Sequence, residues 1–316
     1  ILNLQERERN GYMSETMEHK HGGDIYGVSE DYGINRQSIL DFSANINPLG
    51  LPDTIVEIIE KGIRDIVNYP DPECRELKAA ISGYLNVPEE RIVVGNGASE
   101  IIFLLFEVLK PRKVLIPAPT FAEYERAAMK AGASVEFFRL LEEEGFKLQA
   151  DRLAEAMDKD VDLVVLCNPN NPTSTLTSRD ELLKLVEKAG KRGVNVIIDE
   201  AFIELTVGGN ENSMARYLKD YENLFIIRAF TKLFAVPGLR LGYGAGSRGF
   251  VKKMWSEKTP WSVNSFACAA GKLLTDEKDY LKKTSEWLKE EKSRFYNELC
   301  KFRSLKVFEP QTNFIL

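Results

Sequence analysis

The hydrophobic residues of this chain fall mainly into short continuous runs that alternate with longer amphipathic segments. The runs are rich in Val, Ile and Leu and occupy residues 91–94, 113–117, 133–140, 161–167, 194–199 and 223–230. The segments between them repeat apolar residues at helical spacing, as in the one that ends at Gly193. Strands that are apolar on both faces and alternate with helices are typical of a mostly parallel sheet covered by helices. The pattern therefore predicts an α/β fold.

Polar turns follow five of these strands, at the point where each strand ends. They comprise residues 95–100, 119–124, 168–172, 199–202 and 231–240. Ligands of open α/β sheets bind outside the carboxyl ends of the strands. We therefore expect the five turns to converge on one edge of the sheet and to form a single ligand site there.

The pattern becomes helical beyond about residue 255. Residues 277–302 predict a long amphipathic helix, and residues 305–316 predict a pair of strands. We expect an N-terminal arm over residues 1–40 and a large ligand-binding domain over residues 41–255. Residues 256–316 would begin a smaller α+β domain that is incomplete in this sequence.

The composition limits the binding partners and the cellular location that we expect for this protein. The net charge of −6 gives no reason to expect a nucleic acid or an anionic membrane, and no apolar run approaches the roughly 20 residues that span a bilayer. Charges occupy the N-terminus where a signal peptide needs an apolar core. The four cysteines form no CxxC pair, and there are only two histidines. We expect a cytoplasmic protein with reduced thiols and no metal centre.

The stretch "RAFTKLFAVPGLRLGY", residues 228–243, places Lys232 in a largely apolar setting. An amine attacks an aldehyde only when it is unprotonated, and apolar surroundings favour that state. Lys232 is therefore a candidate for a covalent bond to an aldehyde cofactor. A solvated surface lysine is the simpler interpretation of this segment taken alone.

Asp199 ends the buried strand "VNVIID", where a carboxylate is costly unless it has a cationic partner. A protonated pyridine nitrogen is such a partner, and it keeps a pyridoxal ring able to accept electrons. A helix N-cap is the ordinary structural alternative for an Asp after a strand.

Three further features fit a phosphorylated aromatic cofactor. The turn "GNGASE", residues 95–100, opens a helix, and Thr231 and Arg240 could complete a phosphate site with it. Asn171 lies in the rigid turn "NPNNPT", where its amide could donate to a ring oxygen, and Phe121 could stack on a flat ring. Turn formation and core packing are the simpler explanations for these last two residues.

Taken together and in this order, these motifs resemble the fold type I pyridoxal-phosphate enzymes, the aminotransferase family, from residue 21 to residue 316. The resemblance implies pyridoxal 5′-phosphate as cofactor, a Schiff base at Lys232 and ring-nitrogen pairing by Asp199. It further implies cofactor contacts from the residues that match the remaining motifs: Ala98, Ser99, Glu100, Phe121, Asn171, Thr231 and Arg240. The segment "YPDPE" matches one whose tyrosine, here Tyr69, reaches the cofactor phosphate of the neighbouring subunit, which implies a homodimer.

Two branches of this family compete. Histidinol-phosphate aminotransferases share the cofactor motifs but usually carry "DEAY", whereas this chain has "DEAF" with Phe202. The segments "HGGDIYGVSEDYGI", "LDFSANINPLGLP" and "TPWSVNSFA" are similar to the threonine-phosphate decarboxylases of cobalamin biosynthesis. That resemblance implies decarboxylation of L-threonine O-3-phosphate, or of L-serine O-phosphate, to a phosphorylated amino alcohol.

The resemblance also implies substrate contacts. His21 of "HGG" is the expected contact of the substrate phosphate, and Asn45, Asn171 and Asn264 are expected to line the substrate side. Relatives bind the substrate carboxylate with an arginine that would lie beyond Leu316. Two other functions stay open: an aminotransferase acting on histidinol phosphate or a related amino acid, and a non-catalytic protein that has kept the fold.

Overall fold

The computed structural model describes residues 22–316, which divide into two compact units between Asn45 and Ile46. The described part of the first unit holds helix α2 (Ile25–Tyr32) and the 3-10 helix η1 (Arg36–Ser38). Asp24 caps α2 by accepting a hydrogen bond from the N–H of Gly27 at 2.9 Å.

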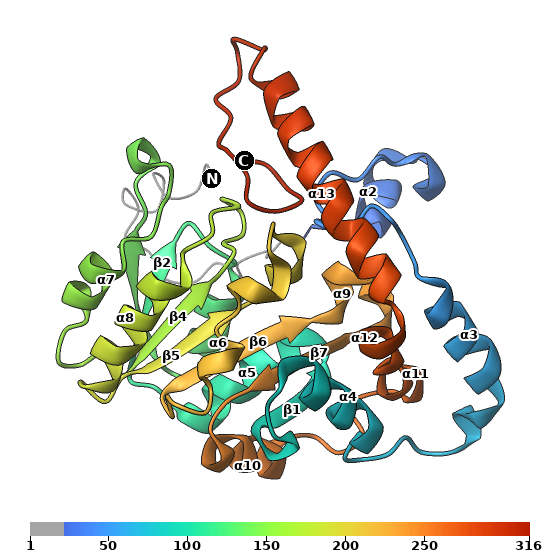
Figure 1. The fold of residues 1–316 in the computed structure, drawn as a ribbon, viewed down its shortest axis with the longest axis horizontal. Helices are drawn as coiled ribbons and strands as arrows, with labels where there is room; N and C mark the ends of the chain where they lie inside the picture. Colours follow the sequence, from blue (N-terminus) through green and yellow to red (C-terminus); the bar gives the residue numbers. More distant parts are fainter. Residues whose placement is uncertain (1–21) are drawn as a thin grey trace. The chain divides into compact units, whose positions relative to one another are not determined.

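The second unit is built on a seven-stranded sheet in the order β1-β7-β6-β5-β4-β2-β3 (Figure 1). The strands are β1 (Ile92–Asn96), β2 (Lys113–Ala118), β3 (Ser134–Arg139), β4 (Leu163–Cys167), β5 (Asn195–Asp199), β6 (Leu224–Ala229) and β7 (Leu241–Ala245). Only β7 runs antiparallel to its neighbours, β1 and β6. The prediction of a mostly parallel α/β sheet is therefore confirmed.

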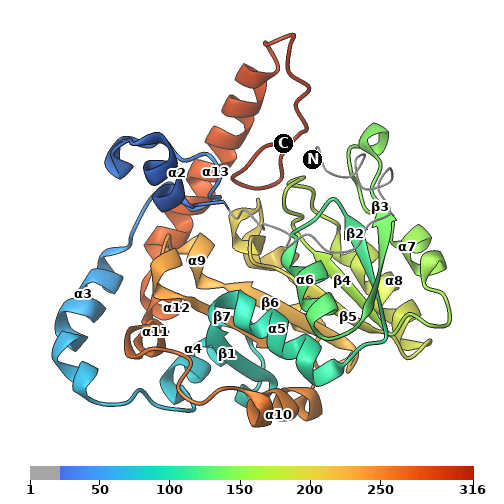
Figure 2. The same cartoon turned by 180° about the vertical axis from the view of Figure 1, so that it is seen from behind.

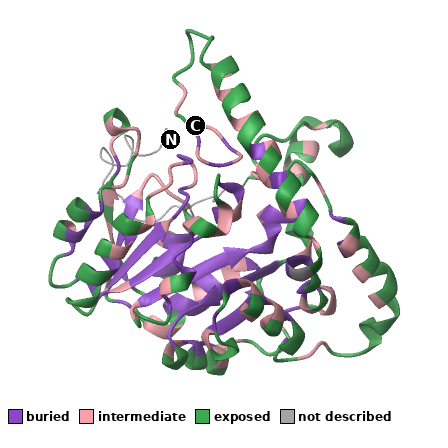
Figure 3. Ribbon diagram, in the orientation of Figure 1, coloured by how far each residue is buried: buried purple, intermediate pink, exposed green. Residues whose placement is uncertain are grey.

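Helices cover both faces of this sheet, because successive strand residues point to opposite sides. Val164 and Leu166 join one apolar cluster, and Val165 between them joins the other. Helices α5, α6 and α10 pack on the second cluster, and α4, α7, α8, α12 and α13 pack on the first (Figure 2). Figure 3 shows the strands buried between these two layers.

The bounds of these helices place the turns that matter for function. The α-helices are α3 (Asp53–Gly62), α4 (Arg75–Leu85), α5 (Gly97–Leu109), α6 (Glu123–Lys130), α7 (Ala150–Ala156), α8 (Arg179–Gly190), α9 (Phe230–Leu233), α10 (Arg248–Glu257), α11 (Ser265–Ala269), α12 (Lys272–Asp276) and α13 (Lys278–Leu299). The 3-10 helices are η2 (Ile63–Val67), η3 (Glu89–Arg91), η4 (Glu142–Glu144), η5 (Ile203–Leu205), η6 (Gly209–Asn212), η7 (Ala215–Tyr217) and η8 (Pro237–Leu239). Among residues 22–316, no helix is long and apolar enough to cross a membrane.

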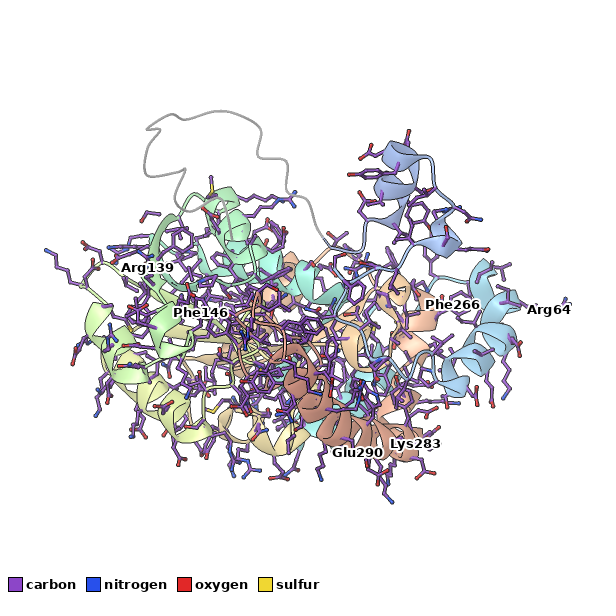
Figure 4. All side chains as sticks on the ribbon, turned by 90° about the horizontal axis from the view of Figure 1, so that it is seen from above. Arg64, Arg139, Phe146, Phe266, Lys283 and Glu290 are labelled. Carbon is purple, nitrogen blue, oxygen red and sulfur yellow. The ribbon has the colours of Figure 1, made fainter. Side chains whose placement is uncertain are left out.

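The long amphipathic helix predicted near the C-terminus is confirmed as α13. Its buried residues, Tyr280, Thr284 and Leu288, recur every four positions. Lys283 and Glu290 lie on its exposed side and project away from the sheet (Figure 4).

The predicted pair of strands after α13 is wrong, because residues 305–316 form no strand. Pro310 has no backbone N–H to donate, and the N–H groups of Gln311 and Thr312 both donate to Ser174. The N–H of Thr312 donates to Oγ of Ser174 at 3.0 Å, and the N–H of Gln311 donates to the Ser174 carbonyl at 2.9 Å. The segment is therefore held as coil against the turn that follows β4.

Candidate active site

A cavity of about 150 Å³ lies at the carboxyl ends of β4, β5 and β6. Eight of the ten predicted cofactor-binding residues line it: Ala98, Ser99, Phe121, Asn171, Asp199, Thr231, Lys232 and Arg240. They come from five separate turns of the chain, as expected for a site at the carboxyl ends of the strands of an α/β sheet. The structure thus brings most of the predicted site together.

Lys232 lies in the short helix α9, directly after β6. Burial lowers the pKa of its amine below the ordinary value, and the nearby Arg240 guanidinium lowers it further. Asp199 acts in the opposite direction but more weakly. The balance makes this amine easier to deprotonate than an ordinary lysine, as a nucleophile requires.

Asp199 is the last residue of β5, and its carboxylate faces the cavity. Its Oδ1 accepts the N–H of Ala201 at 3.0 Å, and its Oδ2 accepts the hydroxyl of Tyr124 at 2.8 Å. Burial raises the pKa of Asp199 to about 6, so this carboxyl loses its proton at a higher pH than an ordinary aspartate does. A cationic group entering the cavity would stabilise the ionised form.

The adjacent carboxylate, that of Glu200, does not face the cavity. Its side chain points to the other face of the sheet, where Oε2 accepts from Nε of Arg228 at 2.9 Å and from Oγ of Ser213 at 2.7 Å. Glu200, the residue after β5, is therefore held in a buried ion pair with Arg228, and Asp199 at the end of β5 is the carboxylate that lines the cavity.

One wall of the cavity is the N-terminus of α5, whose first N–H groups have no helical acceptor. Arg240 reaches this wall with its guanidinium, and its only hydrogen bond among the described residues is from Nη1 to the carbonyl of Pro237 at 3.3 Å. Gly242 lets β7 pack closely against this end of α5, because a Cβ atom there would lie 2.3 Å from the backbone N of Ala98. Free N–H groups, a helix dipole and a guanidinium together form an anion site.

Two asparagines of the "NPNNPT" turn stabilise the turn itself, and the third lines the cavity. Asn168 donates to the carbonyl of Thr177 at 3.2 Å, and Asn170 donates to the carbonyl of Pro119 at 2.9 Å. Both side chains are thus used to shape the turn. Asn171 is the one that lines the cavity, as does the half-buried Phe121.

Glu100 is a predicted cofactor residue that the structure places elsewhere. Its Oε2 accepts hydrogen bonds from the N–H of Asn96 and from Oγ of Ser262, and its carboxylate pairs with Lys258. It therefore fastens the first turn of α5 and does not line the cavity.

Asn264 and Tyr69 are predicted site residues that the structure places outside the cavity lining. Asn264 caps α11 and donates to the carbonyl of Leu239 at 3.0 Å. Tyr69 is 82% exposed and packs on Trp261, with ring centroids 5.1 Å apart. Asn45 belongs to the N-terminal unit, and His21 lies outside the described residues, so both expected substrate contacts stay predictions.

The sequence reasoning missed the two lining residues Tyr124 and Cys167, which carry polar groups. Tyr124 is fully buried in α6, and Cys167 ends β4, where burial raises the pKa of its thiol to about 12. The spacing offered a signal, because Tyr124 follows Phe121 by three residues and so shares its side of a helical turn. Cys167 occupies the strand-end position that is equivalent to Asp199 on β5, with which it is in register.

Phe202, noted in the sequence for its missing hydroxyl, forms an apolar wall of the cavity. Its ring lies 4.9 Å from that of Phe314 in an edge-on arrangement, and Nζ of Lys232 lies 5.8 Å from its centroid. The C-terminal segment therefore packs, through Phe314, against a residue that lines the cavity.

The residues present fit pyridoxal phosphate in their chemistry. An anion site, a buried carboxylate and a low-pKa lysine surround one cavity, with an aromatic ring beside them. These match the phosphate, the ring nitrogen, the aldehyde and the ring face of that cofactor.

The chain matches the family model for aminotransferase class I and II over residues 37–316. The threonine-phosphate decarboxylase of Salmonella typhimurium is 37% identical over 297 residues, which cover 94% of this chain and 81% of that protein. This similarity confirms the family resemblance found in the motifs.

Solved structures give the same family and both of its competing branches. A histidinol-phosphate aminotransferase from Clostridium acetobutylicum matches with a TM-score of 0.81 at 39% identity, covering 88% of this chain and 82% of that chain. An L-threonine-O-3-phosphate decarboxylase from Porphyromonas gingivalis matches with a TM-score of 0.76 at 26% identity, covering 87% and 80%.

Proposed function

Because this chain belongs to the class I and II aminotransferase family, we propose that it is a pyridoxal-phosphate-dependent decarboxylase of L-threonine O-3-phosphate. L-serine O-phosphate is a close variant of this substrate. The product would be (R)-1-amino-2-propanol O-2-phosphate, the linker of the cobamide nucleotide loop. The observation that carries the proposal is the convergence of Lys232, Asp199 and Arg240 on one cavity.

When bound, pyridoxal phosphate supplies an aldehyde for amines and a ring that accepts the electron pair of a bond broken at the substrate Cα. Lys232 would hold the cofactor through its amine and move a proton to Cα after CO2 leaves. Asp199 would keep the ring nitrogen protonated. Arg240, Thr231 and the first N–H groups of α5 would bind the cofactor phosphate.

The remaining lining residues would orient the ring. Asn171 would donate from its amide to the ring oxygen, and Phe121 would pack on the ring face. Phe202 offers no hydroxyl to that oxygen and presents an apolar wall with Phe314 instead. The phenylalanine at position 202, where histidinol-phosphate aminotransferases usually carry tyrosine, supports loss of the carboxylate over transamination, as does the similarity to the Salmonella decarboxylase.

A direct assay tests this proposal against an aminotransferase. The purified protein is incubated with pyridoxal phosphate and either L-threonine O-3-phosphate or L-serine O-phosphate, without a 2-oxo acid, and CO2 and the phosphorylated amine are measured. Release of both in equal amounts is expected. Turnover of histidinol phosphate that requires 2-oxoglutarate, with no CO2, would support the aminotransferase function, which the Clostridium structure favours.

We also propose that the protein acts as a homodimer. Apolar side chains on α3 and η2 are exposed in the single chain, namely Val56, Ile59, Ile63, Ile66 and Val67. The exposed Tyr69 follows this stripe and is the residue expected to enter the neighbouring site. A contiguous apolar surface of this kind is typical of subunit contacts. Location in the cytoplasm stays a prediction.

A further inference from the structure

Tyr124 donates a side-chain hydrogen bond to Asp199, and the proposed function gives Tyr124 no role. Tyr124 is fully buried, and its hydroxyl donates to Oδ2 of Asp199 at 2.8 Å. Its ring meets that of Phe121 edge-on, with centroids 5.6 Å apart. One residue therefore contacts both the carboxylate and the aromatic side chain that the cofactor ring would meet.

We propose that Tyr124 is a positioning residue that orients the Asp199 carboxylate and sets the pH range over which the site holds a protonated ring nitrogen. This inference rests on the proposed function, because it concerns the same pyridoxal-phosphate site. It assigns to Tyr124 an effect on proton affinity and not a contact with substrate.

The hydrogen bond from the Tyr124 hydroxyl helps to fix the orientation of the Asp199 carboxylate. Asp199 takes its two hydrogen bonds on different oxygens, one from a backbone N–H and one from Tyr124, so the plane of the carboxylate is fixed. Burial keeps the pKa of Tyr124 well above its ordinary value, so the hydroxyl stays protonated and donates.

The other groups facing Asp199 do not replace this hydrogen bond. Cys167 of β4 is neutral, since burial raises the pKa of its thiol to about 12. Lys232 of α9 acts on Asp199 only through space, and Glu200, which directly follows β5, is turned towards Arg228 on the other face. Tyr124 is thus the side chain, among those described, that donates to this carboxylate.

The direction of the effect follows from the two influences on Asp199. Burial raises the pKa of Asp199 to about 6, and the hydrogen bond from Tyr124 lowers it. Without the hydroxyl the pKa would rise further, by about one to two pH units for one hydrogen bond to a charged group. A carboxyl that is already protonated cannot pair with a pyridinium unless a proton is released.

The test uses 4-deoxypyridoxine 5′-phosphate, which has a methyl group in place of the aldehyde and cannot bond to Lys232. Its dissociation constant is measured from pH 5 to 8.5 for the full chain and for Tyr124→Phe. In the unsubstituted protein we expect affinity to fall below about pH 6. In Tyr124→Phe the fall should begin about one to two pH units higher.

Tyr84→Phe is the matched control, because Tyr84 donates to another buried carboxylate, Glu204, that does not line the cavity. It should leave the profile unchanged. The titration of the ligand phosphate is common to all three proteins and cancels in the comparison.

A second change keeps the test valid if Tyr124→Phe does not fold. Site-specific 3-fluorotyrosine at position 124 retains the hydroxyl but makes it a stronger donor, so the fall should begin at a lower pH. A folded Tyr124→Phe protein with an unchanged profile, or an unchanged fluorotyrosine profile, would overturn the role of Tyr124. Absence of binding by the folded unsubstituted protein at every pH would overturn the proposed function, and this inference with it.

Discussion

Gly97 and Arg240 approach so closely that no side chain fits between them. A Cβ atom on Gly97 would lie 2.4 Å from Nη2 of Arg240, and the φ angle of Gly97 is +79°. The glycine therefore lets the guanidinium lie directly over the first turn of α5, where the cofactor phosphate is proposed to bind.

Gly97→Ala should displace Arg240 and weaken pyridoxal phosphate binding about tenfold or more, the loss expected from one strained charged contact of about 1.4 kcal/mol. Equilibrium titration of the apoprotein with the cofactor measures this. Gly132→Ala is a matched control, since Gly132 has the same φ of +79° but nothing within 4 Å of an added Cβ. Equal losses in both variants would show that backbone strain, and not Arg240, is responsible.

Lys232→Ala should abolish the absorbance near the visible edge that a lysine–cofactor bond produces, and should lower turnover by more than about a hundredfold. The amine is the group proposed both to hold the cofactor and to move a proton at Cα. The exposed Lys283, changed to Ala, should leave spectrum and turnover intact. A variant at position 232 that keeps the band and its turnover contradicts the proposal.

Most of the site could be predicted because a parallel sheet fixes where its strands end. Once the apolar runs were assigned to strands, the turns after them had to share one edge, and this brought Asp199, Lys232 and Asn171 to the same cavity. Asn171 was singled out by its place in the rigid turn, although all three asparagines of "NPNNPT" suit a turn.

The failures come from contacts that one segment cannot reveal. Glu100 turned from the cavity because Ser262, far along the chain, offers it a hydroxyl. Residues 305–316 form no strand, and Ser174 accepts the backbone donors of Gln311 and Thr312 within that segment. Both outcomes depend on side chains from distant segments, for which local propensity holds no signal.

Dimer formation can be tested on the exposed stripe. Ile66→Glu combined with Val67→Glu places charges where the side chains are 59% and 85% exposed in the single chain, so the monomer should fold normally. We expect a shift from dimer to monomer in light scattering, because an apolar contact would have to bury both charges. Turnover should fall with it if Tyr69 completes the neighbouring site.

The control for this change is Val207→Glu, an exposed apolar position outside the stripe. It should leave mass and turnover unaltered. A protein that is monomeric before any substitution, yet fully active, would contradict both the dimer and the shared site.

Asp199 should cost the apoprotein stability at neutral pH. Burial raises its pKa from 3.8 to about 6, so the folded state binds the proton more tightly than the unfolded state. Stability is then lost as pH rises from about 4 to 6 and stays low above that, a difference of about 3 kcal/mol. Asp199→Asn removes this titration, so the apoprotein should become more resistant to urea at pH 8 by up to about 3 kcal/mol, with little gain at pH 4.

Urea unfolding of both apoproteins at several pH values provides the measurement, with the exposed Asp220→Asn as control. Added pyridoxal phosphate should reverse the order at pH 8, because a pyridinium stabilises the carboxylate but not the amide. An Asn variant that is less stable than the parent at pH 8 without cofactor would mean that the hydrogen bonds from Tyr124 and Ala201 outweigh the burial of the charge.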